Sequence, residues 1–227
     1  MKLLSSTLIA MTVLTSPALT HAADFFDMRS LEPVHGDAKA GSEKAEVCVA
    51  CHGPNGNAII PEFPILAGQR EAYLYWELVE YASGTRPQSS MTAQAQTWSD
   101  TDVRDFAAYF AAQTATPLPP ATVPDESVDL STGEALFLHG DPQRGSPPCQ
   151  GCHGPTANGI EGRKYNAWPI VRGQHALFLA QRLKDYRDGN PGDSSNDFIM
   201  KGVAHTLDDA SIEALALYLS SLPPSAN

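Results

Sequence analysis

Four cysteines occur in two pairs, and a histidine directly follows each pair. The two motifs are Cys48, Cys51 and His52 in the first half of the chain, and Cys149, Cys152 and His153 in the second. Two cysteines at this spacing lie one helical turn apart, so both thiols can bond to the two vinyl groups of one haem. The adjacent imidazole can then bind the iron. The pattern therefore predicts two covalently attached haem c groups.

Three other interpretations of the cysteines are weaker. Two disulfides, a Cys-x-x-Cys redox site or a four-cysteine zinc site would each leave the repeated histidine without a role. Zinc sites also place ~15 to 20 residues between the two cysteine pairs, whereas 97 residues separate Cys51 from Cys149. We therefore interpret both motifs as haem attachment sites.

Methionines are the candidates for the second axial ligand of each iron. After the first 22 residues the chain contains only Met28, Met91 and Met200. Met91 and Met200 occupy matching positions, eight residues before the predicted start of the last helix of each half. His205 is an alternative ligand for the second iron, but Gln96 stands at its counterpart in the first half. We therefore expect a thioether ligand at both irons.

Three further histidines and two prolines lie outside the cysteine motifs. His35, His139 and His175 have no counterpart in the other half of the chain, so they are expected at the surface. Pro64 and Pro169 follow the two motifs. A backbone carbonyl there could accept the second N–H of the motif histidine, which would fix its tautomer. The residues alone leave this role and that of a plain loop proline equally open.

The N-terminus has the pattern of an export signal. Lys2 precedes a short apolar stretch, and small residues lead to a cleavage site after Ala22. The apolar part is shorter than the ~20 residues of a membrane-spanning helix. No cysteine lies near the cleavage site to carry a lipid. Residues 1–22 are thus a predicted signal peptide, and no membrane anchor is expected.

Charge narrows the class of partner. The net charge is -11, with 26 Asp and Glu against 15 Lys and Arg. Loss of Lys2 with the signal peptide makes it -12. A non-specific nucleic-acid or anionic-membrane surface would need a basic footprint, so the net charge disfavours both, and no nucleic-acid partner is expected. Partners guided by charge are expected to have basic docking surfaces.

The mature chain is a tandem repeat. Residues 63–69 (FPILAGQ) return at 168–174 (WPIVRGQ), in addition to the repeated cysteine motif. The intervening segment 114–128 contains four prolines, which favour an extended connector. The predicted organisation is a first domain over residues 23–113, a Pro-rich linker over 114–128 and a second domain over 129–227.

Apolar periodicity within each repeat is helical. The predicted helices are residues 69–83 and 174–188, which end at Gly84 and Gly189, and a last helix in each half, which begins at Ser99 or Asp208. No alternating apolar run is long enough for a sheet. The predicted fold class is all-α.

The combined motifs resemble the cytochrome c4 family, the periplasmic two-haem branch of class I cytochromes c. The similarity covers residues 36 to 222 approximately. It implies two tandem class I cytochrome c domains packed about a pseudo-twofold axis, with His/Met ligation at both irons and a proline carbonyl bonded to each motif histidine. It also implies that the first and last helices of each domain cross closely, at Gly41 and Gly133.

Two features depart from this family or from the repeat. Residues 24–35 extend beyond the usual start of the mature family members. Trp168 and Arg172 stand where the first domain has Phe63 and Ala67. We interpret both departures as adaptations to a particular partner.

An iron with two protein ligands has no open position for peroxide, nitrite or oxygen, which favours an electron carrier over an enzyme. Methionine opposite histidine raises the reduction potential. We therefore expect a periplasmic carrier between respiratory partners, from a quinol-oxidising complex toward a membrane-bound terminal oxidase. The alternative is the two-haem subunit of a periplasmic dehydrogenase, such as a sulfide-oxidising flavocytochrome. A two-haem peroxidase is disfavoured because both repeats retain the methionine.

Overall fold

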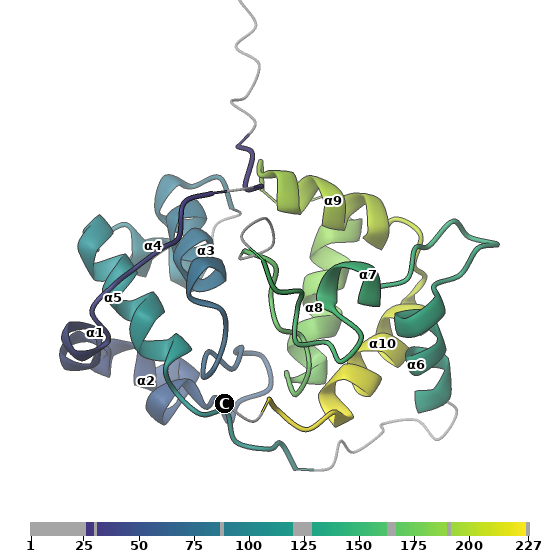
Figure 1. The fold of residues 1–227 in the computed structure, drawn as a ribbon, viewed down its shortest axis with the longest axis horizontal. Helices are drawn as coiled ribbons and strands as arrows, with labels where there is room; N and C mark the ends of the chain where they lie inside the picture. The colour runs from purple at the N-terminus through teal and green to yellow at the C-terminus, as the bar shows by residue number, and fades with distance from the viewer. Residues whose placement is uncertain are drawn as a thin grey trace, which may run out of the picture.

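The computed structural model describes residues 26–29, 31–86, 89–119, 129–162, 167–189 and 192–225. Figure 1 shows two groups of helices side by side. The first group contains α1 (Ala38–Lys44), α2 (Glu46–His52), the 3₁₀ helix η1 (Pro54–Gly56), α3 (Glu71–Ser83), α4 (Ser90–Ala95) and α5 (Asp100–Ala111). The second contains α6 (Leu130–His139), α7 (Gln150–His153), α8 (Ala176–Arg187), α9 (Ser195–Ala204) and α10 (Asp209–Ser221). The described residues form two isolated bridges and no strand, which confirms the all-α prediction.

Some predicted segments lie outside the described residues. The signal peptide 1–22 and linker residues 120–128 are among them. Linker residues 114–119 are described and are not helical. The predicted domain boundaries therefore stay predictions. In the part of the chain that the structure describes, no helix is long and apolar enough to cross a membrane.

Local sequence signals placed the helix ends well. Ser99 begins α5 with a capping box in which Asp102 bonds back to the cap, and Asp208 caps α10. Gly84 ends α3 with φ of 75°, as predicted. α8 instead ends at Arg187, before Gly189, with Asp188 as its cap. Both middle helices also start two residues later than predicted, at Glu71 and Ala176.

The first and last helices of each group cross at a glycine. A Cβ on Gly41 of α1 would lie 2.1 Å from the carbonyl oxygen of Asp105 on α5. A Cβ on Gly133 of α6 would lie 2.1 Å from the carbonyl oxygen of Ala214 on α10. The two helix axes can approach this closely only because glycine has no side chain, which confirms the predicted crossings.

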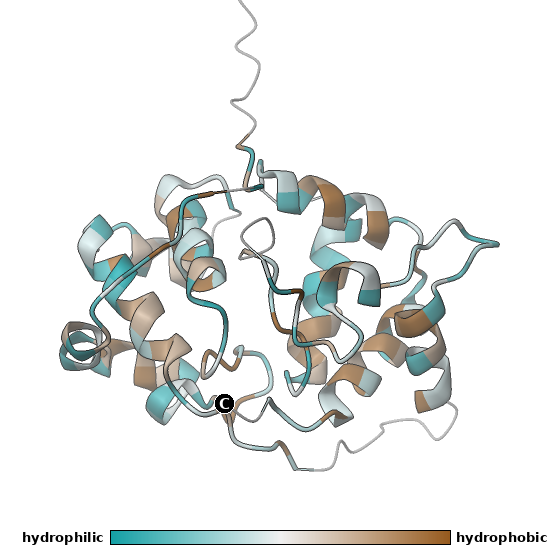
Figure 2. Cartoon of the chain, in the orientation of Figure 1, coloured by the Kyte–Doolittle hydropathy of each residue, from teal (hydrophilic) through white to brown (hydrophobic). Residues whose placement is uncertain are grey.

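Each group of helices has its own apolar core. Val103, Phe106 and Phe110 of α5 are buried with residues of α3 in the first group. Phe137 and Ile212 are buried where α6 and α10 meet in the second group. Figure 2 shows the hydrophobic segments of α6, α8 and α10 gathered where these helices meet. The two cores position the cysteine motifs at their edges.

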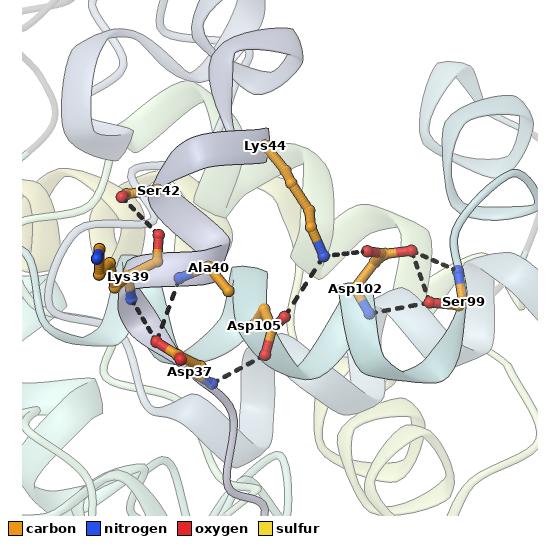
Figure 3. A network of polar contacts seen from close by, with 8 residues as sticks. All are labelled: Asp37, Lys39, Ala40, Ser42, Lys44, Ser99, Asp102 and Asp105. Atoms are coloured by element: carbon orange, nitrogen blue, oxygen red, sulfur yellow. Dashed lines mark hydrogen bonds and ion pairs between the residues drawn. The ribbon is translucent and has the colours of Figure 1, made fainter.

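A polar network also joins α1 to α5, as Figure 3 shows. Lys44 Nζ lies 2.5 Å from Asp102 Oδ1 and 3.5 Å from Asp105 Oδ2. The backbone N–H of Asp37 donates to Asp105 Oδ1 at 2.8 Å, while the Asp37 side chain caps α1. Asp102 additionally accepts from Ser99, the cap of α5. Both ends of α1, at Asp37 and at Lys44, are thus held to α5 by charge-assisted hydrogen bonds.

The described part of the N-terminal extension contacts both groups of helices. The Phe26 ring lies 4.7 Å from the Trp76 ring of α3 in the first group. Its backbone N–H donates to the Asp193 carbonyl, and its carbonyl accepts from Ser195 of α9 in the second group. Met28 is buried, and its N–H donates to Ser195 Oγ at 3.0 Å. The extension therefore ties the two halves together.

Candidate functional site

The first cysteine motif lies on α2 and the turn that follows it. Cys48 is half-buried, Cys51 is exposed, and His52 is the last residue of the helix with 6% of its surface exposed. Gly53 ends the helix with φ of 72°, a left-handed conformation that favours glycine. A Cβ there would lie 2.1 Å from the Asn57 carbonyl oxygen. The chain therefore turns tightly beneath the histidine.

The second motif repeats this arrangement on a shorter helix. Cys149 is the N-cap of α7, Cys152 lies within the helix, and His153 is its last residue. All three side chains are half-buried. Gly154 has φ of 75°, and a Cβ there would lie 2.3 Å from the Gly159 carbonyl oxygen. Both motifs thus present two thiols and one imidazole at the end of a helix.

Each motif histidine is oriented by a proline carbonyl. His52 Nδ1 donates to the Pro64 oxygen at 3.0 Å, and His153 Nδ1 donates to the Pro169 oxygen at 3.1 Å. Use of Nδ1 as the donor fixes the tautomer and leaves Nε2 as the atom with a free lone pair. The structure therefore settles the open question about these prolines in favour of the carbonyl contact.

The ionisation of the motif side chains argues against the redox alternative. Burial raises the pKa of the Cys48 and Cys149 thiols to about 11, and it raises the pKa of Cys152 as well. A redox-active Cys-x-x-Cys pair needs a lowered thiol pKa. Burial also lowers the pKa of His52 and His153, which keeps the imidazoles neutral as metal binding requires.

Metal binding by the protein alone is not supported either. Across the described ranges, no group of three or more His, Cys, Asp and Glu side chains is arranged to hold a metal ion. The four thiols are not joined to one another. Two thiols and one oriented imidazole per motif fit an iron that is already held by a porphyrin, so the residues present fit haem c.

The two predicted methionine ligands lie on equivalent short helices. Met91 is half-buried on α4, which packs on α3, and Met200 is half-buried on α9, which packs on α8. A serine capping box at Ser89 or Ser194 begins each helix. His205, the alternative ligand, is the exposed C-cap of α9. The pairing of each methionine with its motif histidine across an iron is a proposal.

One prediction about the other histidines is wrong. His35 and His139 are exposed, as expected, but His175 is only 7% exposed. Its Nε2 donates to the carbonyl oxygen of Ala58, in the other half of the chain, at 2.8 Å. The repeat comparison missed this contact because the counterpart of His175 is Arg70, whose guanidinium bonds the Asn158 carbonyl at 3.2 Å. Two different donors thus occupy the same position.

Trp168 and Arg172, the aromatic and the basic replacement in the second half, form hydrogen bonds within that half. Trp168 Nε1 donates to Asn196 on α9 at 3.0 Å. Arg172 donates to the carbonyls of Thr156 and Pro223. These contacts give both residues a role in packing, and they do not support the predicted adaptation to a partner.

A cluster of buried charges lies where α3 meets α8 and α9. Glu80 and Asp197 are both buried, and Arg182 lies 3.7 Å from Asp197. Glu80 Oε2 and Arg182 Nε are buried without a hydrogen-bond partner among the described residues. Burial and the neighbouring Asp197 raise the pKa of Glu80 to about 8. The interface between the halves therefore contains unsatisfied polar atoms.

Comparisons with known proteins identify relatives of the whole chain. The sequence model of the family described as cytochrome c matches residues 132–223. Cytochrome c4 of Azotobacter vinelandii is 39% identical over 196 residues, which cover 82% of this chain and 90% of that protein. A protein of Thiomonas intermedia described as a thiosulfate dehydrogenase electron acceptor is 34% identical and covers 82% of this chain and 83% of its own.

The fold agrees as well. The crystal structure of reduced recombinant cytochrome c4 from Pseudomonas stutzeri matches with a TM-score of 0.73 and 39% identity. The match covers 82% of this chain and 99% of that one. It confirms an arrangement of two class I cytochrome c domains. The protein therefore belongs to the cytochrome c4 family and is an electron carrier with two covalently attached haem c groups.

Proposed function

We propose specific roles for eight residues. Cys48 and Cys51 attach the first haem and Cys149 and Cys152 the second, while His52 and Met91 bind the first iron and His153 and Met200 the second. The observation that carries this assignment is the repeated contact of the histidine Nδ1 with a proline carbonyl, because it leaves Nε2 as the nitrogen that would bind a metal in both halves.

Each haem supplies a one-electron iron couple. The chain surrounds that couple with two protein ligands, which leaves no position for a substrate at the iron. The proline carbonyls hold the imidazole rings in one orientation, and the thioethers favour the reduced state and thus a high potential. These features suit rapid electron transfer with little rearrangement.

The carrier is proposed to work in the periplasm, exported by the signal peptide at residues 1–22. Its partners are respiratory proteins, with a terminal oxidase as the acceptor. The mature charge of -12 supports brief complexes with basic docking surfaces, because charge complementarity speeds encounter without requiring tight binding. The alternative is a subunit held tightly by a periplasmic dehydrogenase.

Carbon monoxide binding tests the ligand assignment. Met91→Ala and Met200→Ala should each open one reduced iron to carbon monoxide and lower the potential of that haem, since the thioether stabilises the reduced state. Met28→Ala is the matched control, because Met28 is a buried methionine of the N-terminal extension whose backbone N–H bonds Ser195 and which is not a proposed ligand. A Met200→Ala protein with an unchanged spectrum, together with a changed spectrum for His205→Ala, would contradict the second assignment.

Gel filtration of native periplasmic extract separates a carrier from a subunit. A carrier should elute at the size of the free chain at high salt, because electrostatic contacts weaken as the Debye length falls to about 10 Å near ~0.1 M. A dehydrogenase subunit should elute with a larger partner at both low and high salt, since a buried apolar interface resists salt. Elution with the larger partner under both conditions would overturn the carrier proposal in favour of the dehydrogenase subunit.

A further inference from the structure

Gln174 of the second half forms a pair of hydrogen bonds with the backbone of Ile65 in the first half. Ile65 N–H donates to Gln174 Oε1 at 2.8 Å, and Gln174 Nε2 donates to the Ile65 carbonyl at 3.0 Å. The glutamine side chain is only 7% exposed. One side-chain amide therefore satisfies both polar groups of a buried residue in the opposite half.

Gln69 and Ile170 repeat this contact in the reverse direction. Ile170 N–H donates to Gln69 Oε1 at 2.9 Å, and Gln69 Nε2 donates to the Ile170 carbonyl at 2.8 Å. Gln69 is also 7% exposed. Both glutamines occupy the last position of the repeated segments 63–69 and 168–174. The two contacts are thus related by the repeat, and we call them the glutamine clasps.

Each clasp acts on the peptide group that also orients a motif histidine. The Pro64 carbonyl, which accepts from His52 Nδ1, and the Ile65 N–H, which donates to Gln174, belong to one peptide unit. The Pro169 carbonyl and the Ile170 N–H form the equivalent unit between His153 and Gln69. A single amide therefore lies between the histidine of one half and the glutamine of the other.

We propose that Gln174 tunes the potential of the first haem and Gln69 that of the second, each across the interface through this shared peptide. The inference rests on the proposed iron ligation by His52 and His153. Gln69 and Gln174 are positioning residues, because they act on the histidines through the peptide and do not touch the iron.

The direction of the effect follows from hydrogen-bond cooperativity. Donation of the N–H to the glutamine oxygen polarises the amide and makes its carbonyl a stronger acceptor. A stronger acceptor draws the Nδ1 proton and makes the imidazole a more basic ligand. A more basic ligand favours the ferric state, so each intact clasp lowers the potential of the haem in the opposite half.

This crossed dependence separates tuning from a purely structural role. Loss of a clasp that only held the halves together would loosen one shared interface and affect both haems or neither. Loss of a clasp that tunes should affect one haem, and it should be the haem of the half that does not contain the substituted glutamine. The substituted glutamine and the histidine that responds would then belong to opposite halves of the chain.

The test uses the full-length protein with both haems, Gln174→Met and Gln69→Met variants, and nuclear magnetic resonance of ¹⁵N-labelled histidine. Methionine approximates the length of glutamine but has no oxygen to accept from the peptide N–H. In the reduced Gln174→Met protein the His52 Nδ1–H resonance should move upfield, while that of His153 stays. In the reduced Gln69→Met protein the His153 Nδ1–H resonance should move upfield, while that of His52 stays.

The same resonances report the potentials. Each histidine signal is lost as its own iron is oxidised, so a redox titration followed at His52 and His153 yields one midpoint for each haem. Gln174→Met should raise the midpoint potential measured at His52 and leave the midpoint potential measured at His153 unchanged. Gln181→Met is the matched control, because Gln181 is exposed on α8 and its side chain bonds Asp185 on the same helix.

A conservative variant provides the rescue. Gln174→Glu retains an oxygen that accepts from Ile65 N–H, so the His52 resonance should not move upfield. If Gln174→Met fails to retain both haems, Gln69→Met carries the test, with the expected shift at His153 and none at His52. Equal shifts at both histidines, a shift only at His153, or no shift in Gln174→Met would overturn the tuning role.

Failure of the tuning role is distinguishable from failure of the ligand assignment. In the parent protein, ring protons of a ligated histidine carry a large ring-current shift from the haem. If His52 or His153 lacks that shift, the ligation under Proposed function is wrong. If both show it and the Nδ1–H signals ignore the glutamine substitutions, the ligation stands and the tuning proposal is overturned.

Discussion

His175 donates its Nε2 proton to the carbonyl oxygen of Ala58 at 2.8 Å, across the two halves of the chain. Both residues are buried, so removal of the imidazole leaves the Ala58 carbonyl without its donor inside the protein. The contact is one of a small set that fixes how the two haem-binding halves face each other. Its loss should therefore be felt in the stability of the interface.

We expect His175→Ala to destabilise the protein by about 1 to 3 kcal/mol, because it leaves the buried Ala58 carbonyl without a donor. The free energy of unfolding, measured by denaturant titration, should fall. His35→Ala is the control, since His35 is exposed. An equal effect in the control would contradict the assigned role of the interface bond.

Gly41→Ala should destabilise the first half by about 1 to 3 kcal/mol or more, because the added methyl would lie 2.1 Å from the Asp105 carbonyl. Thermal unfolding should shift to lower temperature. Gly202→Ala on α9 serves as the control, as nothing lies within 4 Å of its Cβ position. That change should stabilise the protein by up to about 1 kcal/mol through helix propensity. Similar unfolding of the two variants would contradict the close crossing of α1 and α5.

The raised pKa of Glu80 predicts a loss of stability as pH rises from 4.5 to about 8. Burial and Asp197 raise its pKa from 4.5 to about 8, so the folded protein holds a proton that the unfolded chain has released. Stability from this group is therefore full below pH 4.5 and falls as pH rises toward about 8. Glu80→Gln should raise the free energy of unfolding at pH 8 by on the order of 2 to 4 kcal/mol and change it little at pH 4.

The control for this prediction is Glu43→Gln, a substitution of an exposed glutamate on α1. It should leave the pH dependence of unfolding intact. Denaturant titrations at several pH values between 4 and 8 provide the comparison. A Glu80→Gln protein that follows the parent at every pH would show that Glu80 is ionised in the folded state.

Replacement of Cys149 and Cys152 together by alanine should remove one covalent haem and leave the other. The first attachment motif lies in a separate apolar core and does not depend on the second. Mass spectrometry of the denatured protein should show two haem additions for the parent and one for the double variant. Cys48→Ala with Cys51→Ala is the reciprocal experiment. Retention of two haems in either double variant would refute the assignment of one motif to each haem.

Local sequence signals determined the helices and the chemistry of the motifs. The capping residues Ser99 and Asp208 act within one turn of their own helices, and they were predicted correctly. The cysteine motifs are likewise local, because the spacing of two thiols and one imidazole fixes their geometry on a helix. Gly41 and Gly133 were informative once the resemblance to a known family placed them at helix crossings.

The tertiary structure alone decided how the halves meet. Nothing within its own segment distinguishes His175 from a surface histidine, because its partner Ala58 is 117 residues away in the chain. The same holds for Gln69 and Gln174, whose partners are 101 and 109 residues away. Sequence comparison of the repeats showed that these glutamines match, but matching residues do not say what they contact. Such contacts depend on the packing of two complete domains, and only that packing turns a repeated Gly-Gln pair into a link between the two haem sites.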